Sequence, residues 1–165
     1  MVPRIDWRLS MTAANIQLRV TDVREVLSEV MDPEYGTLSI VDLGIVADVV
    51  IEHDVVGVTL LPTMAGCPAR EVIESDVRSA LAHAGVSKVT VKWCLDGSWK
   101  PQRLSTKAVA QLGKEFSIAI RNNGALPSCP ICNMASLREV SPVGPTRCRS
   151  VAWCDECRNV VEVVG

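Results

Sequence analysis

The residues best suited to chemistry in this 165-residue chain are its seven cysteines. Five of them fall within the last 37 residues, at Cys129, Cys132, Cys148, Cys154 and Cys157. The N-terminus has no apolar signal core, which predicts a cytoplasmic protein. Because the cytosol keeps thiols reduced, these cysteines indicate metal ligands or reactive groups rather than a disulfide framework.

Four of the C-terminal cysteines form two Cys-x2-Cys pairs, Cys129 with Cys132 and Cys154 with Cys157, separated by 21 residues. This separation is close to the roughly 15 to 20 residues of a four-cysteine zinc site. Two intervening residues let a tight turn aim both sulfurs at one ion, so two such turns complete a tetrahedral shell. The pattern predicts a structural zinc ribbon, with an iron–sulfur cluster as the alternative. A module this short has little apolar material, so metal binding should supply its folding free energy.

Cys148 is a fifth thiol in the same segment, one more than a tetrahedral metal requires. It can replace one of the paired ligands, act as a redox thiol, or be buried as a small apolar residue. The spacing alone leaves these three interpretations open.

A separate cysteine, Cys67, stands in the loop Thr63–Cys67 directly before Pro68, which takes a favoured first position of a helix. The unpaired amides and the dipole of a helix N-terminus favour a thiolate, which is both a nucleophile and a soft metal ligand. The alternative is a small buried residue. Gly66 lets the backbone approach closely and Pro68 begins the helix, so we interpret Cys67 as a reactive or cluster-binding thiol.

Asp42 and Thr63 can offer a carboxylate and a hydroxyl at the end of the sheet that carries Cys67. Spacing alone favours plainer roles for both, as a turn cap and a loop hydrogen-bond donor. No nucleophile has an evident histidine base, and there is no glycine-rich phosphate loop and no pair of catalytic carboxylates. We therefore do not expect the chain to be an enzyme on its own, and a thiol enzyme is the less favoured interpretation.

A small sheet and two helices should hold these residues in place. The β-branched runs predict strands, and apolar residues at helical spacing predict helices. The order helix, strand, strand, helix, strand predicts an α+β fold with two helices on one face of the sheet, followed by the zinc ribbon. The expected elements are a helix at Asp22–Met31 capped by Asp22, strands at Ile45–Ile51 and Val55–Leu61, a helix from Pro68 to Gly85, a strand at Val89–Trp93 and a short helix from Ser105 to Leu112.

The chain divides by composition into an N-terminal extension (1–20), an α+β domain (21–120), a linker of turn-forming residues (121–128) and the zinc ribbon (129–165). The formal net charge of −2 provides no long-range attraction to a phosphate backbone or an anionic membrane surface. No stretch approaches the roughly 18 apolar residues of a membrane helix. Nucleic acids and membranes are therefore not expected as partners.

Three motifs in the N-terminal part are similar to the iron–sulfur cluster assembly domain shared by SufT and MIP-type proteins. They read DPE from residue 32, SIVDLGIV from residue 39 and PTMAGCPA from residue 62. The C-terminal part reads CPIC from residue 129, TRCR from residue 146 and CDEC from residue 154. With both parts together, the chain from Asp22 onward resembles the PaaD (PaaJ) family of phenylacetyl-CoA epoxidase accessory subunits.

The resemblance implies a non-catalytic subunit that assists iron–sulfur or di-iron centre assembly for a di-iron oxygenase in aerobic phenylacetate degradation. Its implied partners are the oxygenase and reductase subunits, and a homodimer is a further assembly left open. The alternative is a structural docking subunit of a related oxygenase or biosynthetic complex, with no role in metal transfer.

The resemblance also implies roles for particular residues. The family's reactive cysteine corresponds to Cys67, its motif aspartate to Asp42 and its motif threonine to Thr63. The implied cofactors are structural zinc in the ribbon and a transient iron or iron–sulfur cluster. The zinc ligands would be drawn from Cys129, Cys132, Cys154 and Cys157, with Cys148 as a fifth or substitute ligand.

Overall fold

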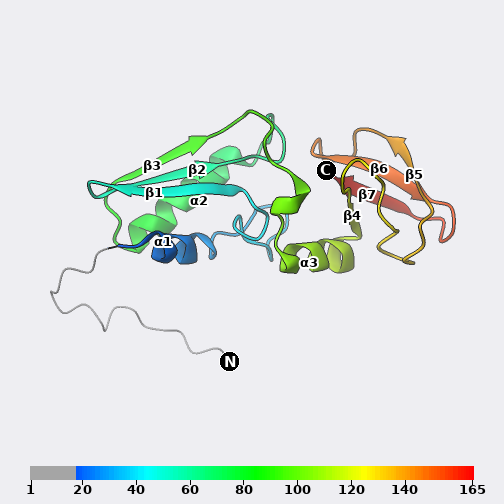
Figure 1. Cartoon of the computed structure of the whole chain (residues 1–165), viewed down its shortest axis with the longest axis horizontal. Helices are drawn as coiled ribbons and strands as arrows, with labels where there is room; N and C mark the ends of the chain where they lie inside the picture. Colours follow the sequence, from blue (N-terminus) through cyan, green and yellow to red (C-terminus); the bar gives the residue numbers. More distant parts are fainter. Residues whose placement is uncertain (1–17) are drawn as a thin grey trace, which may run out of the picture.

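A computed structural model of the chain describes residues 18–165. The expected N-terminal extension, residues 1–20, therefore lies almost entirely outside the described residues. The described part contains two small sheets and three α-helices (Figure 1), which confirms the predicted α+β fold class. No helix in residues 18–165 is long and apolar enough to cross a membrane.

The first sheet is built on the predicted hairpin. Strands β1 (Val46–Glu52) and β2 (Val55–Leu60) pair antiparallel, and β3 (Val89–Trp93) joins β2 in parallel, giving the order β1-β2-β3. The turn residues His53 and Asp54 have φ values of 46° and 65°. Two left-handed residues in a two-residue turn match the twist of the flanking strands, so the turn sets the register of the hairpin.

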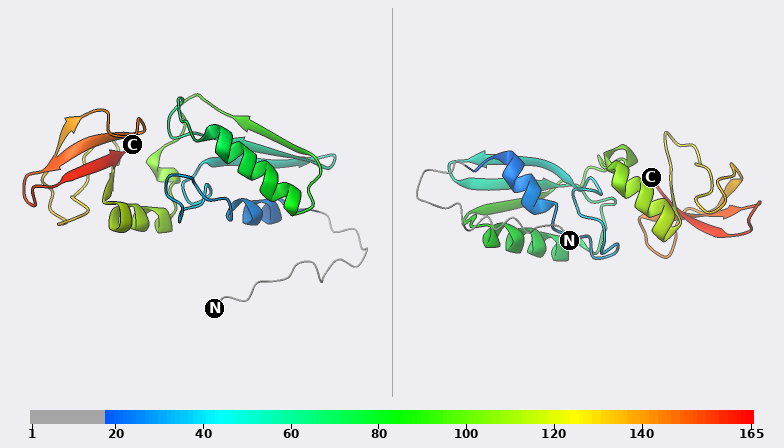
Figure 2. Two further views of the ribbon diagram at one scale, coloured as in Figure 1. Left: turned by 180° about the vertical axis from the view of Figure 1, so that it is seen from behind. Right: turned by 90° about the horizontal axis from the view of Figure 1, so that it is seen from below.

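Helices α1 (Val20–Leu27) and α2 (Arg70–His83) cover one face of this sheet (Figure 2). Helix α1 contacts α2 and β1, whereas α2 contacts β3. Because β2 and β3 are parallel, the chain needs a crossover between them, and α2 provides it. Their buried side chains are Val23, Leu27, Ile73, Val77 and Leu81, which form a core with the inner face of β2.

The predicted bounds of α1 were wrong at both ends. The helix is capped at Arg19, and Asp22 is its third residue, where the carboxylate accepts a hydrogen bond from the Arg19 backbone N–H at 3.1 Å. Asp22 thus accepts a hydrogen bond at the helix N-terminus from the third helical position instead of acting as the N-cap. At the other end Ser28 is the C-cap, and Met31 instead forms an isolated bridge with Ser39.

The predicted start of α2 at Pro68 was also wrong, by two residues. Its first helical hydrogen bond runs from the Ile73 N–H to the Ala69 carbonyl at 2.9 Å, so Ala69 is the N-cap and Arg70 the first helical residue. Pro68 lies in the turn before the helix. The C-terminal end agrees with the prediction, since Gly85 has a φ of 84° just beyond the C-cap.

Helix α3 (Thr106–Phe116) connects the two sheets, after a short 3-10 turn, η2 (Pro101–Arg103). The predicted cap is confirmed, because the Ser105 hydroxyl accepts a hydrogen bond from the Ala108 N–H at 3.0 Å. The helix continues past the predicted end at Leu112 and stops at Ser117, whose φ of 53° is left-handed.

The second sheet has the order β4-β7-β6-β5 and includes the ribbon. Its strands are β4 (Ile118–Ile120), β5 (Leu137–Ser141), β6 (Arg149–Cys154) and β7 (Val160–Val164). Strand β4 pairs in parallel with β7, and the Arg121 N–H donates to the Val164 carbonyl at 2.9 Å. The chain therefore enters the second sheet at β4, just before the expected linker at 121–128. The predicted boundary between the α+β domain and the ribbon stays a prediction.

The loop between α1 and β1 forms hydrogen bonds with residues 99–103, the segment that leads into α3. The Trp99 indole N–H donates to the Leu43 carbonyl at 3.0 Å, and the Arg103 guanidinium donates to the Gly44 carbonyl at 2.8 Å. Gly44 has a φ of 65°, and a Cβ at this position would lie 2.5 Å from the Arg103 carbonyl oxygen. Only glycine accepts both the left-handed backbone and this close approach.

We expect Gly44→Ala to lower the free energy of unfolding by about 3 kcal/mol or more, because backbone strain adds to displacement of the Arg103 segment. Gly97→Ala is a matched control, since Gly97 also has a positive φ of 72° but no atom lies within 4 Å of its would-be Cβ. That control should lose only about 1–2 kcal/mol from the left-handed backbone. Urea denaturation compares the two variants, and equal losses would contradict a steric requirement at Gly44.

Candidate metal centre and the Cys67 loop

The four paired cysteines converge at one end of the second sheet. The sulfur atoms of Cys129, Cys132, Cys154 and Cys157 all lie within 4.8 Å of one another. The Cys129 and Cys157 sulfurs are 3.8 Å apart, and those of Cys132 and Cys154 are 3.6 Å apart. A tetrahedral zinc ion with Zn–S bonds of about 2.3 Å requires sulfur separations of about 3.8 Å, so this sulfur set fits such an ion.

The two Cys-x2-Cys turns have the same backbone geometry. The residue after each pair, Asn133 or Arg158, is left-handed, with φ values of 62° and 54°. Each donates its backbone N–H to the carbonyl of the first cysteine of its pair, at 2.8 Å for Asn133 and 2.9 Å for Arg158. Each turn thus folds back over its own pair, which aims both sulfurs inward.

Burial and neighbouring dipoles act differently on these sulfurs. Cys129 and Cys154 are fully buried. Hydrogen bonds from the Ser136 hydroxyl and the Cys157 backbone lower the pKa of Cys154 to about 6. The Met134 backbone N–H lowers the pKa of Cys132, but burial and its three sulfur neighbours outweigh it and raise that pKa to about 12. Four thiolates in so small a volume would repel one another, and a bound cation would stabilise them.

Cys67 lies in a tight turn before α2. Its backbone N–H donates to the Met64 carbonyl at 3.2 Å, and the residue is half-buried. Because α2 begins at Arg70, Cys67 is two residues before the N-cap instead of adjacent to it. Within residues 18–165 the Cys67 sulfur makes no hydrogen bond. The functional role of Cys67 stays a prediction.

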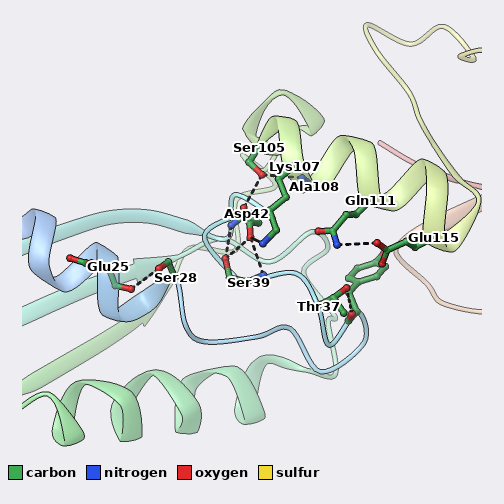
Figure 3. A network of polar contacts seen from close by, with 11 residues as sticks. Glu25, Ser28, Thr37, Ser39, Asp42, Ser105, Lys107, Ala108, Gln111 and Glu115 are labelled. Atoms are coloured by element: carbon green, nitrogen blue, oxygen red, sulfur yellow. Dashed lines mark hydrogen bonds and ion pairs between the residues drawn. The ribbon is translucent and has the colours of Figure 1, made fainter. Parts of the chain in front are cut away.

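Asp42 lies against the N-terminal end of α3 (Figure 3). Its carboxylate accepts hydrogen bonds from Ser39 Oγ at 3.0 Å, Ser105 Oγ at 2.9 Å and Lys107 Nζ at 2.8 Å. Partial burial raises the pKa of Asp42, but the Lys107 ammonium and the two hydroxyls outweigh it and lower the pKa below its ordinary value. In the described part, no hydrogen bond links Asp42 to Thr63 or Cys67, so the structure shows it anchoring α3.

Thr63 and Cys148, by contrast, line one cavity of about 480 Å³ where the α+β part faces the second sheet. Cys148 is not part of the four-sulfur group, and its thiol lies 3.6 Å from Thr146 Oγ1. Cys67 and Asp42 do not line this cavity. Thr63 and Cys148 therefore line the same cavity, and the carboxylate of Asp42 has its hydrogen-bond partners elsewhere, in Ser39, Ser105 and Lys107.

A buried arginine, Arg149, connects the part of the molecule built on the first sheet with the part built on the second sheet. Its side chain is 8% exposed and forms ion pairs with Glu34, in the loop between α1 and β1, and with Glu162 of β7. Its guanidinium carbon lies 5.2 Å from the centre of the Tyr35 ring, which in turn meets Phe116 edge-on at 5.1 Å. Sequence reasoning missed this contact. Its only signals were the DPE and TRCR motifs, which contain Glu34 and Arg149 and were interpreted separately.

Family models match both parts of the chain. Residues 20–93 match the model described as iron–sulfur cluster assembly protein, and residues 116–165 match the PaaD zinc beta ribbon domain. The chain thus combines an iron–sulfur cluster assembly domain with a zinc β-ribbon, and the four clustered cysteines, which could hold a metal ion, lie within the residues that match the ribbon.

The full-length comparison is more specific. The chain is 33% identical over 150 residues to the D component of the putative 1,2-phenylacetyl-CoA epoxidase of Escherichia coli K12, and the match covers 86% of this chain and 89% of that protein. The chain therefore belongs to the same family as that protein, the PaaD family.

Other relatives match a single part. An Fe–S protein maturation auxiliary factor of Bacillus subtilis, YitW, is 33% identical over 96 residues, covering 56% of this chain and 91% of that protein. A crystal structure of a DUF59 domain from Bacillus anthracis is 32% identical with a TM-score of 0.54, covering 57% of this chain and 91% of that one. A conserved hypothetical protein from Thermotoga maritima is 33% identical with a TM-score of 0.51, covering 59% and 96%.

Proposed function

We propose that this protein is an accessory factor that helps load iron or an iron–sulfur cluster into a multicomponent di-iron oxygenase of the phenylacetyl-CoA epoxidase type. In this role Cys67 binds the iron cargo transiently. The ribbon holds a permanent zinc ion through Cys129, Cys132, Cys154 and Cys157 and contacts the oxygenase or reductase subunits. The reduced cysteines suit a cytoplasmic location.

The observation that carries the proposal is the joining of two different kinds of sulfur site in one chain. Four sulfurs, two of them on fully buried residues, would complete the coordination shell of one ion, so that ion would have no open position for exchange. Cys67 is half-buried in a short turn with no hydrogen bond to its sulfur within residues 18–165. A closed site stabilises structure, whereas a single free thiol can accept a metal and release it.

Co-expression with the client oxygenase subunits tests the carrier role. We expect the wild-type protein to raise the iron content of the purified client, and Cys67→Ser to reduce that content to the level found without any accessory protein. Cys94→Ser is the matched control, because Cys94 is also half-buried but packs against the first core. Iron content is measured per client polypeptide after anaerobic purification.

The structural docking alternative makes the opposite prediction. If Cys67→Ser supports the client as well as the wild-type protein does, the thiol is not a carrier. Binding of the client would then depend on the ribbon alone, and Cys154→Ser would abolish co-purification while Cys67→Ser left it intact.

A further inference from the structure

Within the part of the chain that the structure describes, no helix covers the second face of the first sheet, which we call the open face. Helices α1 and α2 both lie on the opposite side of β1, β2 and β3 (Figure 2). On the open face Val50 of β1 is 45% exposed and Gly57 of β2 has no side chain, and a cavity of about 400 Å³ lies over these strands. The open face is therefore a strand surface with a hollow at its centre.

The pairing registers arrange the side chains of the open face in three rows that cross the sheet from β1 to β3. The rows consist of Asp48, Thr59 and Lys92, of Val50, Gly57 and Thr90, and of Glu52, Val55 and Lys88. Lys88 directly precedes β3, and its carbonyl accepts a hydrogen bond from the Val56 N–H at 2.9 Å, which continues the register. Acidic side chains therefore line the β1 side of the open face, and lysines line the β3 side.

The charged side chains of these rows have no ionic partner within residues 18–165. Asp48, Glu52, Lys88 and Lys92 are all exposed, and no ion pair of the described part includes them. The acid and the base of one row stand two strands apart, a backbone separation of about 10 Å. Two separate bands of opposite charge are therefore available to a partner from outside the chain.

The open face is complementary to itself, as a surface that binds its own copy through a twofold axis must be. A twofold axis parallel to the strands places β1 of one copy over β3 of the other, while each row stays over the same row. Asp48 of one copy then faces Lys92 of the other, and Glu52 faces Lys88. Packed sheets lie about 10 Å apart with strand directions within about 30°, a gap that a lysine and a carboxylate side chain span together.

We propose that the open face binds a second copy of this chain and forms a dimer about this twofold axis. Gly57 faces Gly57 at the centre, so no side chain of β2 blocks the approach in the middle row. The axis preserves strand direction, so the two loops that follow β2 and lead to Cys67 lie at the same end of the dimer. The inference goes beyond the proposed function and does not depend on whether Cys67 carries iron.

The size of the open face sets the strength of the dimer. Three strands about 4.8 Å apart and about five residues long cover roughly 250 Å², well below the roughly 800 Å² per partner of a standard interface. Such a small area gives a weak dimer, and its exposed ion pairs make the dimer sensitive to salt. We therefore expect a Kd on the order of 100 µM at low ionic strength.

Sedimentation equilibrium of the full-length zinc-loaded protein tests the dimer with two double variants. Lys88→Glu/Lys92→Glu makes the open face acidic, and Asp48→Lys/Glu52→Lys makes it basic. Each variant should be monomeric alone, because like charges then face each other across the axis. An equimolar mixture of the two should associate at least as tightly as the wild-type protein. Raising the ionic strength from about 0.02 M to about 0.5 M should weaken wild-type association by roughly tenfold.

Lys100→Glu/Arg147→Glu is the matched control, because it makes the same change of net charge as the acidic variant at exposed residues that line the junction cavity instead. This control should dimerise nearly as the wild-type protein does, and circular dichroism checks that every variant is folded. A wild-type protein that stays monomeric at about 1 mM and low salt overturns the proposal. Dimerisation that both charge variants retain also overturns it, since the contact would then use another face.

A different occupant gives a different result. If the wild-type protein is monomeric and the two charge variants lose co-purification with the client oxygenase, the open face binds the client, and self-association is overturned. The iron content of the client in the Cys67→Ser experiment is a separate measurement, so failure of the dimer and failure of the carrier role are distinguishable.

Discussion

Removal of the metal from the cysteine cluster is expected to unfold strands β5 to β7 while the first sheet stays folded. The core of the second sheet consists of six buried residues, and two of them are the cluster cysteines Cys129 and Cys154. Little apolar surface remains without them, so the metal should contribute on the order of 10 kcal/mol to the folding of the ribbon. Hydrogen exchange before and after chelation, read separately over residues 129–165 and 46–93, measures the effect.

Two cysteine variants distinguish a metal ligand from a thiol that lies outside the four-sulfur group. Cys154→Ser should lose the metal and the exchange protection of β6 and β7, because it removes a fully buried ligand. Cys148→Ser should keep both, since Cys148 lies outside the four-sulfur group. Unchanged protection of the ribbon amides after complete chelation would show that its fold does not depend on the metal.

Arg149→Met should have the second-largest effect and should loosen the junction between the two parts. The substitution leaves Glu34 and Glu162 without their shared cation. Because these carboxylates are 38% and 26% exposed, the loss should fall between the about 1 kcal/mol of a surface pair and the about 3–5 kcal/mol of a fully buried one. Urea denaturation gives the loss in unfolding free energy. Arg138→Met is the control, because Arg138 and Asp155 are 61% and 60% exposed and such a pair contributes about 1 kcal/mol or less.

A compensating variant shows whether uncompensated charge is the cause. Arg149→Met combined with Glu34→Gln and Glu162→Gln removes both anions along with the cation, so most of the lost stability should return. If the triple variant is no more stable than Arg149→Met alone, the loss comes from packing against Tyr35, and the electrostatic explanation is wrong.

Strand β6 connects the cysteine cluster with the ion pairs of Arg149. Strand β6 begins at Arg149 and ends at Cys154, so the ion-paired arginine and one of the four clustered cysteines belong to the same element. Cys148 stands directly before it. Loss of the ribbon metal should therefore disturb the position of Cys148 as well.

Much of the first part could be predicted from local sequence. The hairpin, the Ser105 cap and the final Gly85 follow from β-branched runs, a capping side chain and a glycine, all of which act within a few residues. The helix starts were less predictable. Asp22 and Pro68 are both good N-terminal residues. The first helical hydrogen bonds, which the Arg19 and Ala69 carbonyls accept, decided which position each would take.

The sequence by itself determined the sulfur cluster, because two Cys-x2-Cys pairs need only local turns and one ion to converge. Tertiary structure alone decided the surroundings of the other chemical groups. Asp42 forms an ion pair with Lys107, Cys148 lines the same cavity as Thr63, and Arg149 forms an ion pair with Glu34. These partners are 65, 85 and 115 residues apart in the chain. Contacts at such separations depend on how whole elements pack, and no local pattern encodes that packing.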